Sequence, residues 1–356
     1  MQINRLRLCN FRQHEHTDLA LGAGLTGIIG PNGAGKTTIL EGIAWAMYGM
    51  PAARGSRETI RRRGAPPRSR VEVELEFTLG AHQYRVVRTL NGAELYHEVR
   101  GTGPPVLLIM GATGDGGHFD AFADALADEF TVVTYDRRGN GRSPAPAGWQ
   151  TTSVEEQADD AAGLLQVLGT GPAAIFGTSA GGNFALCLLV RHPGWVRGAI
   201  LHDPGLYALV DDFDVVRAPV RALVQEASEA GGPPLAVERF WSYVAGEAGW
   251  NRLAPELRKR LRATASTLFG IELGSYELYM PDDQTLTSLA APVHLLVSEE
   301  SEDRLPFLAE IAGQLSQRLG VEVATTPGGH DAYHEYPDEL AAAVRPFLGK
   351  VSGARI

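Results

Sequence analysis

The sequence predicts an α/β protein with a mostly parallel sheet and a helical cap, preceded by a small partial lobe of a different kind. Three observations predict it: an apolar strand runs through a glycine-framed serine into a helix, a later strand ends in a loop histidine, and a glycine-rich loop near the N-terminus enters a helix. The length of 356 residues, 44% of them apolar, allows one domain of about 250 residues and a smaller one.

The serine lies in the segment Ile175-Phe176-Gly177-Thr178-Ser179-Ala180-Gly181-Gly182, which contains a G-x-S-x-G match. Small residues two positions before and after the serine allow a sharp turn from strand to helix, which lifts the hydroxyl above the sheet edge. A bare match is common by chance, but this one has a strand before it and a helical pattern after it. Ser179 is therefore the predicted nucleophile, and a glycine-rich turn without chemistry is the alternative.

A nucleophilic serine needs a general base, expected at the end of a later strand. Alternating apolar residues at 321–326 predict that strand, and Pro327 with two glycines ends it. His330 falls in the loop that follows and is the predicted base, with an ordinary surface histidine as the alternative. His334 is interpreted as solvated.

The acid that orients the imidazole is less well defined. The predicted strand 292–297 is followed by four acids within six residues, a pattern that is also typical of a solvated loop. Glu300 is the first choice because it lies a short turn past the strand, and Glu302 is the second. Asp203, at the end of the preceding strand 198–202, is the third, and the sequence leaves the three open.

Two backbone N–H groups are expected to stabilise the oxyanion of a tetrahedral intermediate. Ala180 follows the nucleophile and supplies the first. The loop after the predicted strand 106–109 is rich in glycine, and the N–H of Ala112 is the expected second donor.

With these residues in place, the chain from about residue 93 to 350 resembles an α/β-hydrolase. The resemblance implies a hydrolase domain at residues 91–350, with a cap at about 204–289 over the site. Met110 departs from the histidine that many members have, and Ser301 stands near the position where a catalytic Asp is common, which leaves the acid open. The segments that carry the resemblance are the first hairpin at 92–105, the loop Asp136-Arg137-Arg138-Gly139-Asn140-Gly141-Arg142-Ser143, the serine turn, and Gly329-His330 with Glu335 and Pro337.

The predicted cap is rich in aromatic residues on several helices, with a break at Gly231-Gly232-Pro233-Pro234. Such a cap suggests an apolar acyl or alcohol pocket. The same rings can equally pack the cap onto the sheet, so the substrate is not readable. The aromatic residues are Phe240, Trp241, Tyr243, Trp250, Phe269, Tyr276 and Tyr279.

The N-terminal quarter carries a different motif, a full G-x-x-x-x-G-K-[ST] match at residues 30–37. A strand is predicted before it at 25–29, and a helical run follows at 38–48. In that context the loop N–H groups would wrap phosphates, Lys36 would reach the β/γ oxygens, and Thr37 would hold Mg²⁺. ATP and Mg²⁺ are the cofactors expected here, and the hydrolase needs none. The predicted nucleotide-binding residues are Gly30, Asn32, Gly33, Gly35, Lys36, Thr37 and Thr38.

Residues 1–90 resemble the N-terminal P-loop NTPase lobe of SMC and SbcC-type DNA-repair ATPases. Besides the P-loop, the resemblance rests on the segments at residues 6–12 and 39–43, on Tyr48-Gly49, and on a hairpin formed by residues 71–79 and 84–88. In that family a C-terminal lobe with a signature motif and a Walker B strand completes the head, after a coiled coil, and none of these is found here. Residues 132–136 resemble a Walker B strand superficially but are assigned to the hydrolase. An isolated half is expected to bind nucleotide weakly and turn it over poorly.

Charge divides the chain in the same place. Residues 1–90 hold 13 Lys and Arg against 7 Asp and Glu, and the remainder holds 19 against 35. The basic cluster Arg61-Arg62-Arg63 with Arg68 and Arg70 could contact DNA phosphates, but such runs are usually solvated loops and the acidic remainder would repel a polyanion. The expected partner is therefore a small acyl substrate rather than nucleic acid.

The two cysteines suggest no disulfide framework, and the sequence has neither a membrane-length apolar run nor a signal-peptide pattern, so a cytoplasmic protein is expected. The predicted function is that of a serine hydrolase that cleaves an ester or related acyl bond through an acyl-enzyme. The alternative is a nucleotide-binding or DNA-repair-type ATPase fragment with the hydrolase fold as a passenger. A third reading is a pseudoenzyme that has lost the acid and kept a binding pocket. Whether the fusion is natural and which oligomer forms are left open.

Overall fold

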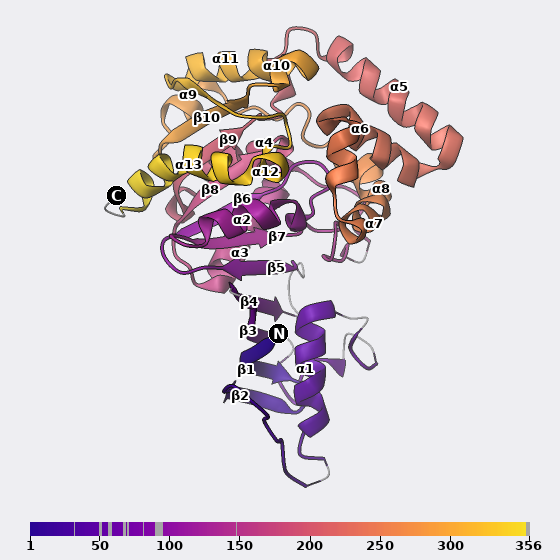
Figure 1. Cartoon of the computed structure of the whole chain (residues 1–356), viewed down its shortest axis with the longest axis vertical. Helices are drawn as coiled ribbons and strands as arrows, with labels where there is room; N and C mark the ends of the chain where they lie inside the picture. The colour runs from indigo at the N-terminus through magenta and orange to yellow at the C-terminus, as the bar shows by residue number, and fades with distance from the viewer. Residues whose placement is uncertain are drawn as a thin grey trace.

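The computed structural model describes residues 1–31, 33–49, 52–55, 59–66, 69, 71–80, 82–89, 95–146 and 148–353. Asn32 of the P-loop, Arg68 and Arg70 of the basic cluster, and the join at 90–94 lie outside them. A single 11-stranded sheet runs through the chain in the order β11-β10-β9-β8-β6-β7-β5-β4-β3-β1-β2 (Figure 1). No helix among the described residues is long and apolar enough to cross a bilayer.

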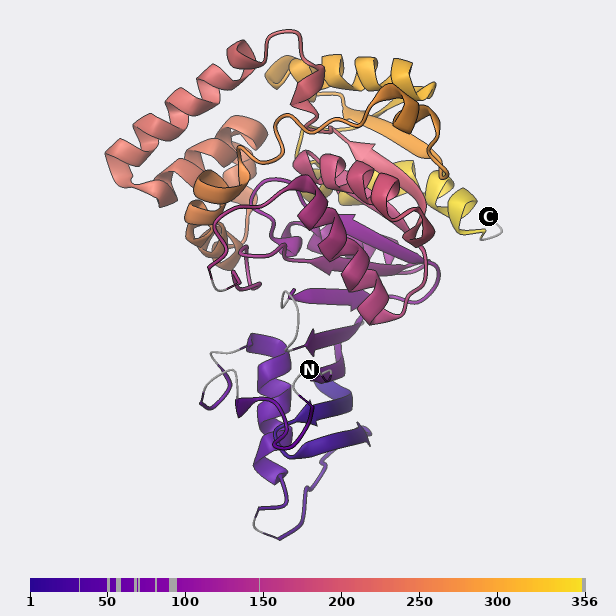
Figure 2. The same ribbon diagram turned by 180° about the vertical axis from the view of Figure 1, so that it is seen from behind.

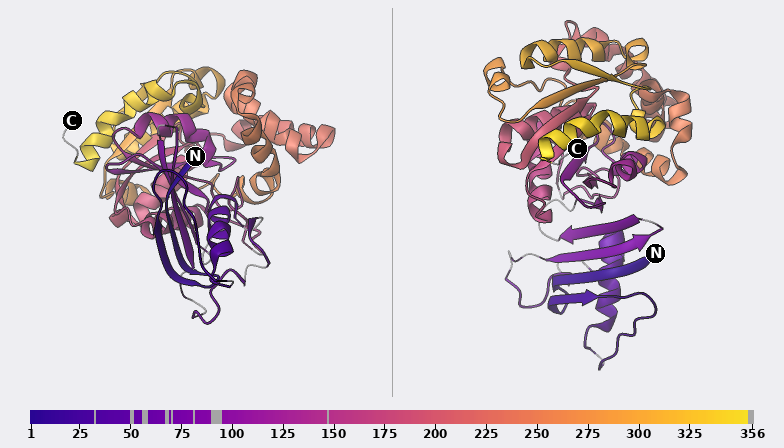
Figure 3. Two further views of the ribbon diagram at one scale, coloured as in Figure 1. Left: turned by 60° about the horizontal axis from the view of Figure 1, so that its bottom comes forward. Right: turned by 60° about the vertical axis from the view of Figure 1, so that its left-hand side comes forward.

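The N-terminal lobe, residues 1–89, contributes four antiparallel strands to one end of this sheet. The strands are β1 (Gln2–Phe11), β2 (His14–Ala20), β3 (Glu72–Leu79) and β4 (His82–Thr89). The helix α1 (Lys36–Tyr48) covers one face and buries Trp45 against Phe11 (Figure 3). The hairpin predicted at 71–79 and 84–88 is confirmed.

The C-terminal part, residues 95–353, forms the rest of the sheet. Its first strand, β5 (His97–Arg100), is antiparallel to its neighbours, and all the others are parallel. The serine, histidine and acid candidates therefore all lie near one edge, because the carboxyl ends of parallel strands meet there. The parallel strands are β6 (Pro105–Ile109), β7 (Thr131–Tyr135), β8 (Ala173–Thr178), β9 (Val196–His202), β10 (Val293–Ser298) and β11 (Val323–Thr326).

Helices cover both faces of the parallel strands, so these strands are buried on both sides (Figure 2). Leu107 and Ile109 of β6 pack on the side of α3 (Val154–Leu168), α4 (Ala180–Arg191) and α11 (Phe307–Leu319). Val106 and Leu108 pack on the opposite side, with η3 (Gly116–Phe119), α2 (Asp120–Leu126) and α13 (Pro337–Ser352). This alternation follows from the two-residue period of a strand.

Strand β4 belongs to both parts of the molecule. It pairs with β3 along its length and with β5 through Tyr84 and Arg85. Val86 is buried in the core of the N-terminal lobe, whereas Val87 is buried in the core of the C-terminal part. Within the described residues, strand β4 thus connects the N-terminal lobe to the rest of the sheet.

Most of the segment predicted as a cap forms a group of helices, residues 213–272, beside one end of the strands, whereas its last helix, Asp283–Thr287, lies next to α11 (Figure 1). The break predicted at 231–234 separates the first two helices. Trp241, Trp250 and Tyr276 are buried, so these rings pack the helices onto the rest of the chain. The helices are α5 (Phe213–Gly231), α6 (Pro233–Arg252), α7 (Pro255–Ala263), α8 (Ala265–Thr267), η6 (Leu268–Glu272) and α9 (Asp283–Thr287). Further short elements are η4 (Pro193–Trp195), η5 (Tyr207–Leu209), α10 (Ser301–Arg304) and α12 (Ala332–Glu335).

The strand predicted before the P-loop, at 25–29, is wrong. These residues carry no regular structure, and Ile29 is 97% exposed. Both sides of β1 are already paired, with β2 and β3, and β4 is paired with β5 at its far side. In this lobe, the outer edge of β2 is therefore the edge at which the apolar run 25–29 could pair, and the run does not pair there.

Candidate active site

Ser179 occupies a strained turn between β8 and α4. Its backbone lies at φ 55° and ψ −129°, a region that non-glycine residues rarely adopt. Its N–H donates to His202 O at 3.0 Å, and its carbonyl accepts from Gly205 N at 3.0 Å. Neighbouring backbone thus holds the predicted elbow, and the side chain remains partly exposed to solvent.

The framing glycines are required by close approaches at this turn. A Cβ on Gly177 would lie 2.3 Å from Gly181 O, and a Cβ on Gly181 would lie 2.1 Å from Ile109 O. Both distances are far inside van der Waals contact with backbone atoms that cannot move freely. The G-x-S-x-G pattern is therefore imposed here by sterics.

His330 follows β11 and its Nδ1 lies 3.1 Å from Asp203 Oδ2. Asp203 directly follows β9, and both side chains are buried. A carboxylate accepts only, so the Nδ1 proton points at Asp203 and Nε2 is left as the basic nitrogen. No hydrogen bond joins Ser179 Oγ and His330 within the described residues, and the hydrogen bond that His330 makes there is the one to Asp203.

Asp203 is held by donors besides His330. Ser298 N donates to Oδ1 at 3.0 Å, while the hydroxyls of Ser298 and Ser301 donate to Oδ2 at 2.9 and 2.8 Å. Burial would raise the pKa of Asp203, but His202, His330 and the Ser298 N–H outweigh it, so the pKa lies well below its usual range. Asp203 is consequently ionised throughout the neutral range.

A second buried imidazole lies behind the acid. His202 Nε2 is 2.8 Å from Ser298 Oγ, and its Nδ1 is 2.9 Å from Thr178 Oγ1. Because Ser298 gives its own proton to Asp203, His202 must donate through Nε2 and accept from Thr178. Burial lowers the pKa of His202 to about 4, so it is neutral at pH 7. The chain Thr178, His202, Ser298, Asp203 links the serine turn to the acid.

The prediction that Glu300 orients His330 is wrong. Glu300 is exposed, its carboxylate makes no hydrogen bond to His330 among the described residues, and its backbone N–H bonds Gly328 O at 3.0 Å. Asp203, the third candidate, takes that place, because β9 lies next to β8 and turns its carboxyl end toward the serine. The side chain of Glu302 lies outside the described residues.

The two predicted oxyanion donors belong to segments that meet at Ser179. Ala180 is the first residue of α4, and Ala112 lies in the turn after β6. A Cβ on Gly111 would lie 2.8 Å from Ser179 Cβ, so the Ala112 turn packs directly on the elbow. The N–H groups at a helix start have no partner within the helix, which leaves Ala180 N–H free to meet an anion.

Comparison with known proteins gives matches to both parts of the chain. A family profile described as an alpha/beta hydrolase fold matches residues 104–230, and a profile described as an AAA domain matches residues 5–102. The uncharacterized hydrolase YraK of Bacillus subtilis is 30% identical over 261 residues, which cover 73% of this chain and 94% of that protein. This chain belongs to the α/β-hydrolase family. The resemblance of residues 93–350 to an α/β-hydrolase is therefore confirmed, and the AAA profile agrees with the P-loop lobe predicted in residues 1–90.

Two further proteins are similar to this α/β-hydrolase. A 2-(acetamidomethylene)succinate hydrolase of Mesorhizobium japonicum is 32% identical over 261 residues, covering 70% of this chain and 89% of that protein. A thermophilic esterase from Thermogutta terrifontis superposes with a TM-score of 0.56 at 26% identity, covering 80% of this chain and 99% of the other. The chain is an enzyme of the hydrolase type, as these relatives are.

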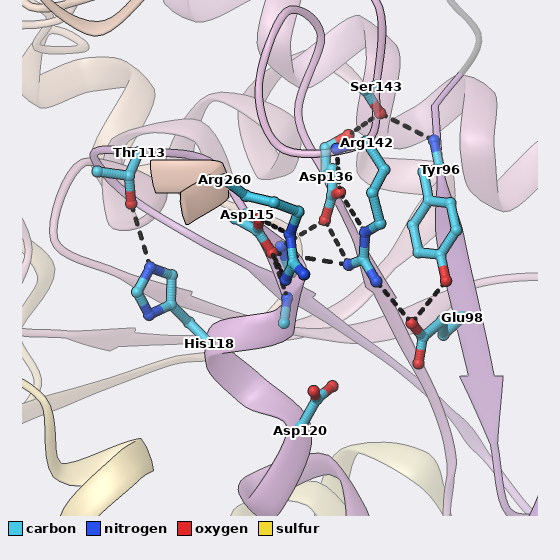
Figure 4. A network of polar contacts seen from close by, with 12 residues as sticks. Tyr96, Glu98, Thr113, Asp115, His118, Asp120, Asp136, Arg142, Ser143 and Arg260 are labelled. Atoms are coloured by element: carbon cyan, nitrogen blue, oxygen red, sulfur yellow. Dashed lines mark hydrogen bonds and ion pairs between the residues drawn. The ribbon is translucent and has the colours of Figure 1, made fainter. Parts of the chain in front are cut away.

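A network of charged side chains adjoins the loop that follows β6 (Figure 4). Asp115 accepts from Arg260 of the cap helix α7, with Nε at 2.6 Å, and Asp136 accepts from Arg142 Nε at 2.7 Å. Burial and the charge of Asp115 raise the pKa of Asp136 to about 6 against the opposing effect of Arg142. The network fixes cap helix α7 against the loop that follows β6.

His334, interpreted from the sequence as solvated, is only partly exposed. Its Nε2 lies 2.8 Å from Nδ1 of the buried His118. His118 also lies 3.2 Å from Thr113 Oγ1 and stacks on Trp241 of α6 at 4.4 Å between ring centroids. Burial lowers the pKa of His334 to about 4 and lowers that of His118 as well, so the pair is neutral and connects the loop after β6 to the helix after His330.

Proposed function

We propose that this hydrolase cleaves an ester or related acyl bond through a covalent acyl-enzyme on Ser179. The strained conformation of Ser179, at the edge where Asp203 and His330 meet, carries the proposal. A non-glycine residue persists in such a conformation only where its surroundings force it, which is common at active sites. A serine at this position also argues against relatives that use an aspartate nucleophile.

The proposed proton path begins at Ser179 Oγ. His330 Nε2 takes the hydroxyl proton as the oxygen attacks the acyl carbon, and it later returns the proton to the leaving alcohol. Asp203 keeps the Nδ1 proton on its own side and stabilises the imidazolium that forms. Water, activated by the same histidine, then resolves the acyl-enzyme.

The oxyanion of the tetrahedral intermediate would be bound by the N–H groups of Ala112 and Ala180. Ala180 directly follows Ser179, and Gly111, which precedes Ala112, packs against the Ser179 side chain, which supports this assignment; neither donor would use a side chain for the purpose. Met110 in place of a histidine is therefore compatible with function. Removing one such donor in other enzymes costs about 10²–10³ in kcat.

The proposed substrate is a small acyl compound. The named relatives include an esterase and a hydrolase of 2-(acetamidomethylene)succinate, which agree with acyl-bond cleavage but differ in substrate.

The test is turnover of p-nitrophenyl esters by the wild type and by Ser179→Ala. We expect hydrolysis by the wild type and its loss in the variant, with an unchanged melting temperature because only one oxygen is removed. Equal turnover by the two proteins would refute the acyl-enzyme proposal.

Some features of the structure favour the alternative function, nucleotide binding at the P-loop, and others do not. Gly33 and Gly35 adopt positive φ, and Lys36 and Thr37 begin α1, which suits a phosphate cradle. However, the strand before the loop is missing, and Lys36 Nζ donates to Gly30 O and Pro31 O, both at 2.7 Å. Binding of ATP with Mg²⁺ at this loop stays a prediction.

A further inference from the structure

The side chain of a buried arginine contacts two carbonyls of the loop that carries Ala112, one of which, Gly111 O, also accepts from Gly114 N at 3.1 Å. Arg137 Nε donates to Met110 O at 3.0 Å, and Arg137 Nη2 donates to Gly111 O at 2.8 Å. Gly111 C=O and Ala112 N–H belong to the same peptide unit, which is planar and trans, so the two groups point in opposite directions. Fixing Gly111 O therefore fixes the direction of the Ala112 N–H.

The guanidinium of Arg137 is completely buried and needs a counter-charge. Glu272 supplies it through two parallel hydrogen bonds of 2.7 and 2.8 Å, and this carboxylate is also 0% exposed. Asn140 donates to Glu272 Oε1 at 2.8 Å and holds the carboxylate from a second side. A bidentate pair of this kind fixes the plane of the guanidinium as well as its position.

The carboxylate comes from the cap. Glu272 is the last residue of η6, a single π-helical segment of the kind that often marks functional positions. Arg137 lies in the loop after β7, so the pair joins the cap to the strand edge across 135 positions in the sequence. The cap segment thus supplies the negative charge that pairs with Arg137 at the carboxyl ends of the strands.

We propose that Glu272 is a positioning residue: through Arg137 it orients the peptide whose N–H, that of Ala112, binds the oxyanion. This inference rests on the proposed acyl-transfer function. Because the oxyanion forms only during the reaction, a misdirected donor weakens the transition state more than the bound substrate. Loss of the Glu272 charge should therefore appear in kcat rather than in KM.

The variant that tests this is Glu272→Gln, which keeps the side-chain shape and one acceptor but places an NH₂ group against the guanidinium. We expect kcat for p-nitrophenyl esters to fall on the order of 10²-fold, as for a small displacement of a catalytic group, with KM changed less than about threefold. A fluorophosphonate probe, whose phosphoryl oxygen occupies the same donors, should label Ser179 more slowly by a similar factor.

The neighbouring arginine gives a matched control. Arg138 also makes a bidentate pair, with Asp160 of α3, in which Nε lies 2.6 Å from Oδ2. Its guanidinium touches no carbonyl of the loop after β6 among the described residues. Asp160→Asn should lower the melting temperature without lowering kcat.

If Glu272→Gln does not fold, Asn140→Ala provides the second test. It retains both charges and removes the amide that steadies Glu272 Oε1, and kcat should fall roughly tenfold at constant KM. The inference would be overturned if the folded test variant, Glu272→Gln or Asn140→Ala, had the same kcat as the control Asp160→Asn. A wild type that fails to label with fluorophosphonate would instead overturn the proposed function.

Discussion

The substitution Asp203→Asn tests which carboxylate serves His330. The side chain keeps its size but exchanges one acceptor oxygen for an NH₂ donor. Ser298 donates its backbone N–H to Oδ1, and a backbone donor cannot become an acceptor, so the amide oxygen must stay there. The NH₂ group is therefore forced into the Oδ2 position, against His330 Nδ1.

The consequence is the wrong tautomer at the base. To meet the NH₂ group, His330 must accept at Nδ1 and carry its proton on Nε2, where it cannot take the proton of Ser179. The same exchange in a serine protease lowers kcat by about 10⁴-fold, and we expect a loss of that order here, or about 5 kcal/mol in activation free energy. Ser298 and Ser301 can rotate their hydroxyls, so the fold should survive.

The assay is p-nitrophenyl ester hydrolysis under single-turnover and steady-state conditions, with Glu300→Gln as the paired variant. Glu300 is exposed and makes no bond to His330 among the described residues, so its kcat should stay within about twofold of the wild type. A large loss in Glu300→Gln together with a small loss in Asp203→Asn would refute the hydrogen-bond reasoning.

Three further predictions concern stability and the N-terminal lobe. Because β4 places Val86 in one core and Val87 in the other, calorimetry should show one cooperative unfolding transition, and two well-separated transitions would contradict the shared strand. The depressed pKa of Asp203 means that its carboxylate stabilises the fold above the ordinary Asp pKa of about 4, and that this contribution is lost as the pH falls below it. The difference in unfolding free energy between wild type and Asp203→Asn in urea should therefore be larger at pH 7 than at pH 3.5, and a difference that grows on acidification would contradict the assignment. If ATP binds at the P-loop, ATP with Mg²⁺ should raise the melting temperature of the wild type and not of Lys36→Ala; an equal shift in both proteins would place the nucleotide elsewhere.

The serine turn, the histidine loop and the strands around them could be predicted because each depends on local sequence. Glycines on either side of Ser179 and a strand end before His330 are visible without knowing what lies beside them. The acid depended on tertiary placement: Asp203 contacts His330 only because β9 lies between β8 and β10. A single acid at the very end of a strand is the available signal for Asp203, but the four acids at 299–303 are a more conspicuous pattern in the sequence.

Other features could not be read from local pattern at all. Arg137 lies in a recognisable loop, but its partner Glu272 is in the cap, where nothing distinguishes it from other glutamates. The apolar run at 25–29 has strand composition and forms no strand, because pairing requires a neighbour. The strand at 84–89 could serve either part of the chain, and in the structure it serves both.

The central claim is that Ser179 is an activated nucleophile. Incubation of the wild type with a fluorophosphonate probe, followed by peptide mapping by mass spectrometry, tests it directly. We predict a single covalent adduct on Ser179, absent from Ser179→Ala and strongly slowed in His330→Ala. A wild type that takes up no probe, or carries it on another residue, would contradict the account.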